Sequence, residues 1–285
     1  MKIILFGSSG QVAEEVIRRA PDDVVIKSLS REDADFSSPD AVQRIALSVE
    51  ADAFINAVAY TAVDDAENDE HIANAINNIS VAKLAEAAST RSIPLVHIST
   101  DYVFDGSGTT PRASTAPTGP LNVYGRTKLA GEMALVASGA KYIILRTSWV
   151  FSAFGNNFVK TMVRVGQDRS TLNVVSDQIG GPTPAAAIAD AAIKAAVYLT
   201  EGFPSGTYHF SGTPDVSWAD FAREVFFQSN MDVDVLDIPT SSYPTPAKRP
   251  LNSRLNCRAT KDDLGIDRPM WKTHLTDVLK ELAAK

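Results

Sequence analysis

Short apolar runs alternate with stretches of helical periodicity through the first half of the chain, and this alternation strongly constrains the fold. Continuous apolar strands separated by helices are typical of a parallel sheet that is covered on both faces. The sequence therefore predicts an α/β fold, a Rossmann-type doubly wound parallel sheet with a smaller C-terminal lobe. The predicted strands are residues 3–6, 24–29, 53–58, 95–100 and 142–145, and the predicted helices are residues 40–49, 71–90 and 123–137, with another that begins after residue 10.

A glycine-rich turn joins the first predicted strand to the first predicted helix. Residues 7–13 read Gly-Ser-Ser-Gly-Gln-Val-Ala, with Ala13 where the commoner motif has its third glycine. Glycines let the backbone turn sharply and approach a pyrophosphate, and free N–H groups at a helix start face the anion. A glycine-rich turn without a ligand is the alternative. Its position between a strand and a helix favours a dinucleotide site.

The end of the second predicted strand carries residues expected to distinguish NADPH from NADH. An acidic residue at this point binds the ribose 2′-hydroxyl, whereas an arginine suits a 2′-phosphate. Ser30 and Arg31 favour NADPH, while Glu32 and Asp33 follow directly and leave NADH possible. Arg31 as a solvated loop charge is the alternative. Asp35, followed by Phe36, is placed to contact the adenine amino group.

The pattern changes after about residue 150, where Gly-Pro and Pro-rich segments appear. We expect residues 1–150 to form an NAD(P)-binding Rossmann domain. Residues 151–285 are expected to form mainly a substrate-binding lobe, with some later segments returning to the sheet. Neither a repeat nor a low-complexity linker separates the two parts.

Composition argues against several other classes of partner. The net charge of −7 disfavours nucleic acid and anionic membrane surfaces. The single cysteine, Cys257, cannot form an intrachain disulfide, and four histidines with one cysteine give no zinc spacing, so no metal is expected. Because no apolar run approaches the length of a membrane span, we expect a soluble, cytoplasmic protein without a membrane partner.

Tyr124 and Lys128 are four residues apart in a predicted helix, so that both side chains lie on one face. An unperturbed tyrosine has a pKa of about 10, and a neighbouring ammonium would lower that pKa. Such a tyrosine can give its proton to a carbonyl oxygen. The Y-x-x-x-K spacing often occurs by chance, however, and an interfacial tyrosine with a solvated lysine is the simpler interpretation of the spacing alone.

Polar residues end the predicted strand 95–100, at the edge where open α/β sheets bind ligands. Ser99 and Thr100 could hold a substrate carbonyl beside Tyr124, or they could cap a turn. His97, within the strand, is expected to be a satisfied core residue and not a catalytic one.

Four segments together resemble the extended short-chain dehydrogenase/reductase family: residues 7–13, 56–64, 99–106 and 124–128. Residues 146–151, 155–162, 177–183 and 243–253 make the chain similar to the dTDP-4-dehydrorhamnose reductases within that family, and the matches span nearly the whole chain in order. The resemblance implies reduction of the C4 ketone of dTDP-4-dehydro-L-rhamnose to dTDP-L-rhamnose. NADPH is the expected cofactor, NADH a possible one, and a nucleotide sugar the expected substrate.

The resemblance also implies a role for each matched position. Thr100, Tyr124 and Lys128 match the catalytic residues: Tyr124 as proton donor, Lys128 lowering its pKa and holding the nicotinamide ribose, Thr100 orienting the carbonyl. Trp149 would pack on the sugar, and Arg249 would bind the diphosphate. Together with the residues argued above for the end of the second strand, the expected cofactor residues are Gly7, Gly10, Gln11, Val12, Ser30, Arg31, Asp35, Phe36, Ala57, Ala59, Thr61, Tyr124 and Lys128. The implied substrate residues are Ser99, Asp101, Tyr102, Trp149, Asn157, Gln178 and Arg249.

Two other functions stay open. The regulatory beta subunit of methionine adenosyltransferase has a similar fold and binds NADP without catalysis, and a reductase of another nucleotide-4-ketosugar would carry the same motifs. Some members of the family dimerise through a magnesium ion held by glutamates. Glu15 fits one such position, but residues 184–187 offer no second acid. We therefore expect a monomer or a homodimer without a metal bridge.

Overall fold

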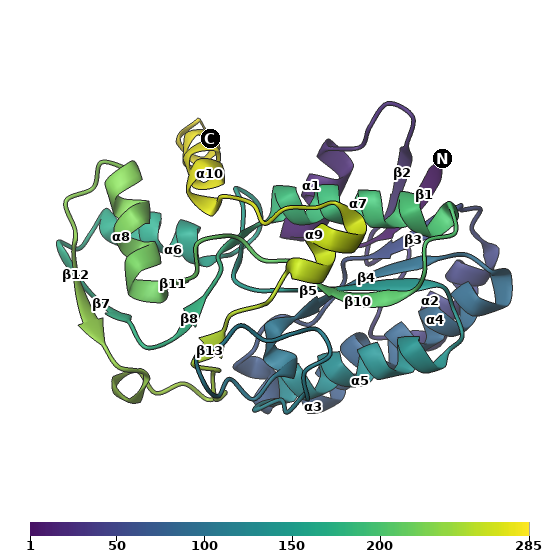
Figure 1. Ribbon diagram of the computed structural model, residues 1–285, viewed down its shortest axis with the longest axis horizontal. Helices are drawn as coiled ribbons and strands as arrows, with labels where there is room; N and C mark the ends of the chain where they lie inside the picture. Colours follow the sequence, from purple (N-terminus) through teal and green to yellow (C-terminus); the bar gives the residue numbers. More distant parts are fainter. Residues whose placement is uncertain (285) are drawn as a thin grey trace.

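A six-stranded parallel sheet organises the larger part of the computed structural model, which describes residues 1–284 (Figure 1). The spatial order is β2-β1-β3-β4-β5-β10, and every neighbouring pair is parallel. The order reverses between β1 and β3, the switch point beside which such sheets bind ligands. The doubly wound Rossmann-type sheet is therefore confirmed. Its strands are β1 (Lys2–Phe6), β2 (Val25–Leu29), β3 (Ala53–Asn56), β4 (Leu95–Thr100), β5 (Tyr142–Thr147) and β10 (Gly206–His209).

Helices cover both faces of the sheet because its strands are apolar on both sides. Successive strand residues point to opposite faces. Ile3 and Leu5 pack with α1 and α7 on one face, whereas Ile4 and Phe6 pack with α2 and α4 on the other. Figure 1 shows this layering, with α1 and α7 on one side of the sheet and α4 and α5 on the other. The helices are α1 (Gln11–Arg18), α2 (Pro39–Ser48), α4 (Ser80–Arg91), α5 (Val123–Ala137) and α7 (Ala185–Thr200).

The predicted helix 71–90 is interrupted. It consists of α3 (Glu70–Asn74), the π-helical turn η2 (Ala75–Ile79) and α4. Asn77 in the π turn is buried, accepts from Tyr60 N at 2.8 Å and donates to Thr127 Oγ1 at 3.1 Å. A π turn inserts one extra residue into a helix. Here it lets Asn77 join the loop after β3 to α5.

A second region with its own core follows the sheet in the chain and lies to the left in Figure 1. It is built from α6 (Phe158–Gly166), α8 (Trp218–Gln228), α10 (Trp271–Ala283) and the parallel pair β7 (Thr171–Val175) and β12 (Asp234–Ile238). Aromatic side chains such as Phe221 and Trp271 fill its core. Although α7 and β10 come after residue 150, they belong to the sheet.

Short elements connect the two regions. A three-stranded sheet has the order β11-β8-β13, and β6 pairs with β9. These strands are β6 (Val150–Phe151), β8 (Ile179–Gly180), β9 (Thr183–Pro184), β11 (Val216–Ser217) and β13 (Asn252–Ser253). The remaining short elements are α9 (Arg258–Leu264) and the turns η1 (Asp65–Glu67), η3 (Asp101–Val103) and η4 (Thr240–Ser242).

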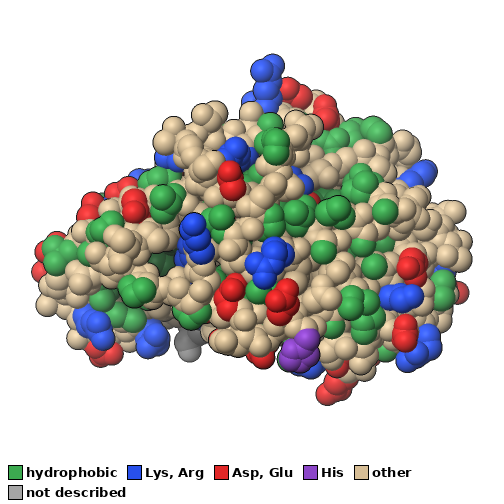
Figure 2. Space-filling model, turned by 90° about the horizontal axis from the view of Figure 1, so that it is seen from below, with side chains coloured by type: hydrophobic (Ala, Val, Ile, Leu, Met, Phe, Trp, Pro, Cys, Tyr) green, Lys and Arg blue, Asp and Glu red, His purple; other side chains and the backbone are tan. Residues whose placement is uncertain are grey.

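The exposed surface is mixed in character. On the face shown in Figure 2, acidic and basic side chains are interspersed with scattered hydrophobic ones. No helix among residues 1–284 is long and apolar enough to cross a membrane.

Close packing of α5 on η2 predicts a stability effect at Gly131. A Cβ at this position would lie 2.1 Å from the backbone oxygen of Asn77, so that Gly131→Ala must push the two elements apart. We expect a loss of about 1–3 kcal/mol in the free energy of unfolding, measured in urea. On the same helix, Met133 is exposed, and Met133→Ala should change the free energy by less than about 0.5 kcal/mol. A stabilised Gly131→Ala protein would contradict the close contact, because alanine favours helices intrinsically.

Candidate active site

A pocket of about 280 Å³ opens at the carboxyl end of β1, beside the switch point of the sheet. Gln11, Val12, Thr61, Tyr124 and Lys128 do not line it. Val12 packs instead against the core cluster under α1 and α7, which leaves only its backbone available to a ligand. The predicted cofactor residues that line the pocket are Gly7, Gly10, Ser30, Arg31, Asp35, Phe36, Ala57 and Ala59.

The glycine turn gives this pocket an anion-binding end. Gly7 has a φ of +106°, which side chains rarely adopt, and a Cβ there would lie 3.3 Å from Val58. Gly10 is the N-cap of α1, no described side chain caps it, and a Cβ on Gly10 would meet no described atom within 4 Å. The first N–H groups of a helix carry partial positive charge. The turn therefore combines open space with backbone donors, as a pyrophosphate requires.

At the opposite end of the pocket, Arg31 lies on an exposed turn. Its Nε is 3.5 Å from Asp35 Oδ1, and its side chain is 81% exposed. An exposed ion pair of this kind contributes only about 0–1 kcal/mol, so a phosphate could displace it. The hydroxyl of Ser30 donates to Asp33 at 2.8 Å, which shapes the turn and leaves Ser30 less free to bind a ligand than predicted.

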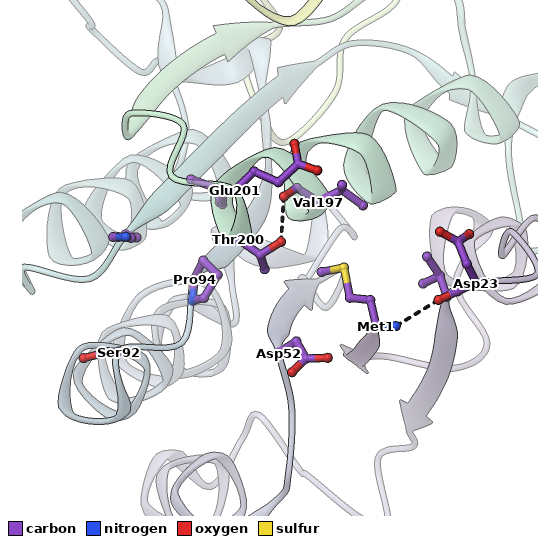
Figure 3. A pocket seen from close by; sticks show the side chains of 11 residues that line it. Met1, Asp23, Asp52, Ser92, Pro94, Val197, Thr200 and Glu201 are labelled. Carbon is purple, nitrogen blue, oxygen red and sulfur yellow. Dashed lines mark hydrogen bonds between the residues drawn. The ribbon is translucent and has the colours of Figure 1, made fainter.

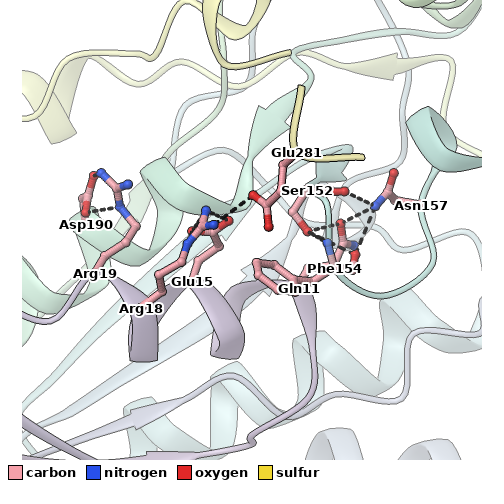
Figure 4. Close-up of polar contacts among 9 residues, drawn as sticks. All are labelled: Gln11, Glu15, Arg18, Arg19, Ser152, Phe154, Asn157, Asp190 and Glu281. Atoms are coloured by element: carbon pink, nitrogen blue, oxygen red, sulfur yellow. Dashed lines mark hydrogen bonds and ion pairs between the residues drawn. The ribbon is translucent and has the colours of Figure 1, made fainter. Parts of the chain in front are cut away.

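Gln11 ties the start of α1 to the second region of the chain (Figure 4). Its Oε1 accepts from Asn157 Nδ2 at 2.9 Å and from Ser152 Oγ at 3.2 Å. Asn157 Oδ1 accepts from Lys160 N and so caps α6. Both side-chain amides serve the fold. This differs from the predicted substrate contact of Asn157, whose donors are taken by the backbone oxygen of Ser152 as well as by Gln11.

Thr100 and Tyr124 come together where β4 ends and α5 begins. Asn122 caps α5 through a 2.8 Å bond from Gly125 N, which fixes the turn that carries Tyr124. Burial raises the pKa of Tyr124, and a hydrogen bond with Thr100 opposes this rise. The Thr100 hydroxyl also donates to Asp101 Oδ1 at 3.1 Å. The Tyr102 and Tyr124 rings meet edge to face at 5.5 Å.

Lys128 has other partners than the sequence predicts. Its Nζ donates to the backbone oxygen of Ile98 at 2.7 Å and lies 3.2 Å from His97 Nε2. Burial lowers the pKa of Lys128 to about 8, against an opposing effect of Glu132. The bonds of Lys128 to β4 therefore place its amine against His97 and Ile98. His97 is fully buried and hydrogen-bonded, as expected of a core residue.

The hydroxyl of Ser99 already has a buried partner, so it is less available to a substrate than predicted. Its hydroxyl donates to the buried Glu132, and Arg146 binds Glu132 at 2.7 Å. Neighbouring strand residues point to opposite faces, so Ser99 and Thr100 cannot both reach one ligand. The sequence carried no signal for the Glu132–Arg146 pair beyond two charges in apolar surroundings.

The second region contributes an aromatic pair. Trp149 stacks on Trp218 with ring centroids 3.6 Å apart, and its φ of +49° is unusual for a bulky residue. Gln178 is buried, accepts from Trp218 Nε1 at 3.2 Å and donates to Thr240 Oγ1 at 3.1 Å. Gln178 therefore holds the tryptophan pair, and its amide is less available for substrate than predicted. Trp218 was not foreseen from the sequence.

Arg249 lies beside Tyr102, which forms a tyrosine cluster with Tyr124. Its Nη2 pairs with Asp64 Oδ2 at 2.6 Å, and Asp64 Oδ1 accepts from Ala247 N at 3.1 Å. Burial raises the pKa of Tyr102 to about 12, and the nearby Arg249 opposes this. Asp64 thus anchors the C-terminal segment that carries Arg249. It lies within the recognised segment 56–64, but nothing in the sequence indicated its partner.

A larger cavity of about 540 Å³ lies at the other edge of the sheet (Figure 3). Asp52, Pro94 and Lys141, which directly precede β3, β4 and β5, help to line it. It therefore lies at the amino ends of the strands, opposite the edge where open α/β sheets bind ligands.

The family model described as the RmlD substrate binding domain matches residues 1–284. The chain belongs to this family. It is 41% identical over 293 residues to the dTDP-4-dehydrorhamnose reductase of Escherichia coli K12, covering 99% of this chain and 98% of the relative. The family resemblance expected from the sequence is thus confirmed.

Solved structures agree with the family assignment. A dTDP-4-dehydrorhamnose reductase of Clostridium acetobutylicum has a TM-score of 0.93 at 35% identity, covering 99% of this chain and 100% of that one. The Bacillus anthracis reductase, solved in complex with NADP, has a TM-score of 0.92 at 34% identity, covering 98% and 99%. A UDP-glucose 4-epimerase with a TM-score of 0.83 at 16% identity, covering 100% of this chain and 98% of that one, shares the fold alone.

The buried carboxyl of Asp101 predicts a pH dependence of stability. Burial raises its pKa to about 6, although the hydroxyls of Ser253 and Thr100 lower it. An unfolded aspartate has a pKa of about 3.9, so the native state binds more protons between about pH 4 and pH 6. Stability should therefore fall as the pH rises through this range. Asp101→Asn cannot ionise, so its unfolding free energy in urea should rise relative to wild type over the same range. A constant difference would contradict the shifted pKa.

Proposed function

We propose that this chain uses NADPH to reduce the C4 ketone of dTDP-4-dehydro-L-rhamnose, giving dTDP-L-rhamnose. The observation that carries the proposal is the hydrogen-bonded pair Thr100 and Tyr124, at the sheet edge that also holds the glycine-turn pocket. The full-length relationship to reductases of this name supports the substrate. The NADP complex of the Bacillus anthracis reductase supports the cofactor.

The pocket residues suit NADPH, which supplies the hydride when it is bound. Gly7 and Gly10 would hold the pyrophosphate at the start of α1, as the unusual φ of Gly7 and the open space at Gly10 allow. Arg31 would bind the 2′-phosphate. Asp35 and Phe36 would contact the adenine. In this proposal, residues 1–150 with α7 and β10 form the cofactor-binding part, and most of the later chain forms the substrate lobe.

Tyr124 provides the proton. Because burial raises its pKa, the Tyr124 hydroxyl stays protonated at neutral pH. It can give its proton to the ketone oxygen while the C4 carbon receives the hydride. Thr100 would exchange its hydrogen bond to Asp101 for one donated to the same oxygen, and would so orient the ketone. Reduction then leaves an alcohol at C4 and a phenolate at Tyr124, which must recover one proton per turnover.

The substrate would lie between the tyrosine cluster and the second region. Arg249 has the planar, charged geometry that a diphosphate requires, and it would exchange its bond with Asp64 for the ligand. Trp149, already stacked on Trp218, offers its other face to the sugar. Asp101 and Tyr102 would bind sugar hydroxyls. A monomer or metal-free homodimer remains our proposal for the assembly, since Arg18 binds the Glu15 carboxylate at 2.8 Å.

Tyr124→Phe separates a reductase from a non-catalytic NADP-binding subunit. The variant loses only the proton donor, so kcat with the dTDP-4-ketosugar should fall by at least about 10²-fold, while NADP and nucleotide still bind. Tyr142→Phe, at the amino end of β5, should keep full activity. If wild-type protein binds NADP but oxidises NADPH with none of a panel of nucleotide-4-ketosugars, the reductase proposal fails.

Arg31 is predicted to set cofactor preference. Removing a charge-assisted hydrogen bond to the 2′-phosphate costs about 1.5 kcal/mol, so Arg31→Ala should raise KM for NADPH about tenfold and leave KM for NADH unchanged. The exposed Arg44 of α2 does not line the pocket, and Arg44→Ala is the matched control. Equal effects of Arg31→Ala on both cofactors would exclude this role.

A further inference from the structure

A buried polar chain lies behind Lys128. The side chains of Asn56 at the end of β3, His97 in β4 and Lys128 in α5 are all fully or almost fully buried. Asn56 Nδ2 is 3.1 Å from His97 Nδ1, and His97 Nε2 is 3.2 Å from Lys128 Nζ. The family resemblance predicts a catalytic role for Lys128, but neither Asn56 nor His97 has a part in the function proposed above.

The backbone decides which nitrogen of His97 carries its proton. Val58 N donates to Asn56 Oδ1 at 3.0 Å, so the oxygen of this amide faces Val58 and its NH₂ group faces His97. If the Asn56 amide were flipped, its NH₂ group would face the N–H of Val58, and two donors would lie against each other. His97 Nδ1 must therefore accept. Burial and Lys128 hold the pKa of His97 well below its usual range, so the ring is neutral and its single proton is on Nε2.

The Nε2–H bond of His97 consequently points at the amine of Lys128. An N–H donor destabilises an ammonium and stabilises a neutral amine, whose lone pair can accept it. The other groups facing Lys128 are the backbone oxygen of Ile98, which accepts from Nζ, and Glu132 on the same helix. Glu132 is itself neutralised by Arg146 from β5. Burial is the main cause that disfavours the ammonium, and among the groups that contact Lys128 within the described chain, the N–H of His97 acts in the same direction.

We propose that His97, held by Asn56, is a positioning residue that presents its Nε2 proton to Lys128 and lets the lysine gain and lose a proton near neutral pH. This inference rests on the proposed function, in which the Tyr124 phenolate must recover a proton after each turnover. Lys128 lies one helical turn from Tyr124 on the same face. As an ammonium it gives up one proton toward the phenolate, and as an amine it takes one back from solvent. The Lys128 pKa of about 8 agrees with this role.

The tautomer can be measured without any activity assay. Long-range ¹H–¹⁵N spectra of the full-length protein, with and without NADP, should show His97 protonated at Nε2, and His97→Phe assigns its signals. His209 is an internal reference of the opposite kind, since its Nδ1 lies 2.9 Å from the backbone oxygen of Arg112 and must donate. Protonation of His97 at Nδ1 would overturn the proposal, whether or not the chain is a reductase.

Asn56→Asp tests the consequence for catalysis. The carboxylate can still accept from Val58 N, but toward His97 it only accepts, so the ring proton should move to Nδ1 and Nε2 should become an acceptor for the ammonium. The kcat for reduction falls at high pH when Lys128 loses its proton, and this basic limb should move upward by about one pH unit or more. A switched tautomer with an unmoved limb would overturn the proposal, as would a moved limb without the switch.

The proposal can be tested even if the Asn56→Asp variant is unstable. If Asn56→Asp fails to fold, the wild-type tautomer still decides the geometry, and the basic limb of His97→Phe decides the consequence. That variant lacks the opposing N–H group, so its limb should also move upward. A lower kcat with the limb in the wild-type position would mean that His97 only supports the fold. Loss of the proposed function would show differently, as a wild type that binds NADP but reduces no ketosugar.

Discussion

The parallel direction of β1, β3 and β4 is the constraint on which the site depends. Phe6 pairs with Asn56, and Asn56 pairs with His97, so the segments that follow these three strands leave the sheet at the same end. The glycine turn, the loop that begins at Ala57 and the Thr100 turn therefore meet, although about a hundred residues separate the first from the last. An antiparallel neighbour would send one of these turns to the far edge. The hydrophobic pattern that buries both faces of the strands thus also decides where the chemistry can occur.

The second region reaches this edge through a few polar links. Gln11 bonds to Ser152 and Asn157 near the cofactor turn, and Asp64 holds Ala247 and Arg249 near the tyrosines. These bonds are part-buried and charge-assisted at Arg249, so each contributes more than an exposed contact. Gln11, Asn157 and Arg249, which the resemblance assigns to ligand binding, thus also hold the two regions together through these bonds. In the same region, the amide of Gln178 accepts a hydrogen bond from Trp218, and the ring of Trp218 stacks on that of Trp149.

The sequence predicted the elements better than it predicted the partners of polar side chains. The helix 123–137 has the bounds that the periodicity indicates, because its local turn and capping residues suffice to define them. Gly7, Gly10, Ala57 and Ala59, which come from two separate loops, line one pocket. The partner of Ser99, in contrast, could not be predicted, because Glu132 lies 33 residues away. Lys128 is held by His97, 31 residues away, and Arg249 by Asp64, 185 residues away. Such pairings depend on strand register and face, which a linear spacing does not contain.

Burial separates the acid–base properties of groups that sit within one cluster. It raises the pKa values of Tyr124 and Asp101 and lowers that of Lys128, because in each case it disfavours the charged form. The carboxyl of Asp101 and the amine of Lys128 thereby have pKa values closer to neutral pH, while the phenol of Tyr124 stays protonated. A tyrosine that ionised easily would be a poor proton donor at neutral pH, and a lysine that never deprotonated could not relay protons. Sites that push the pKa values of neighbouring groups apart assign acid and base roles by environment. Here the environment is the carboxyl end of a parallel sheet, where the side chain of Lys128 is buried and the backbone oxygen of Ile98 in β4 accepts its hydrogen bond.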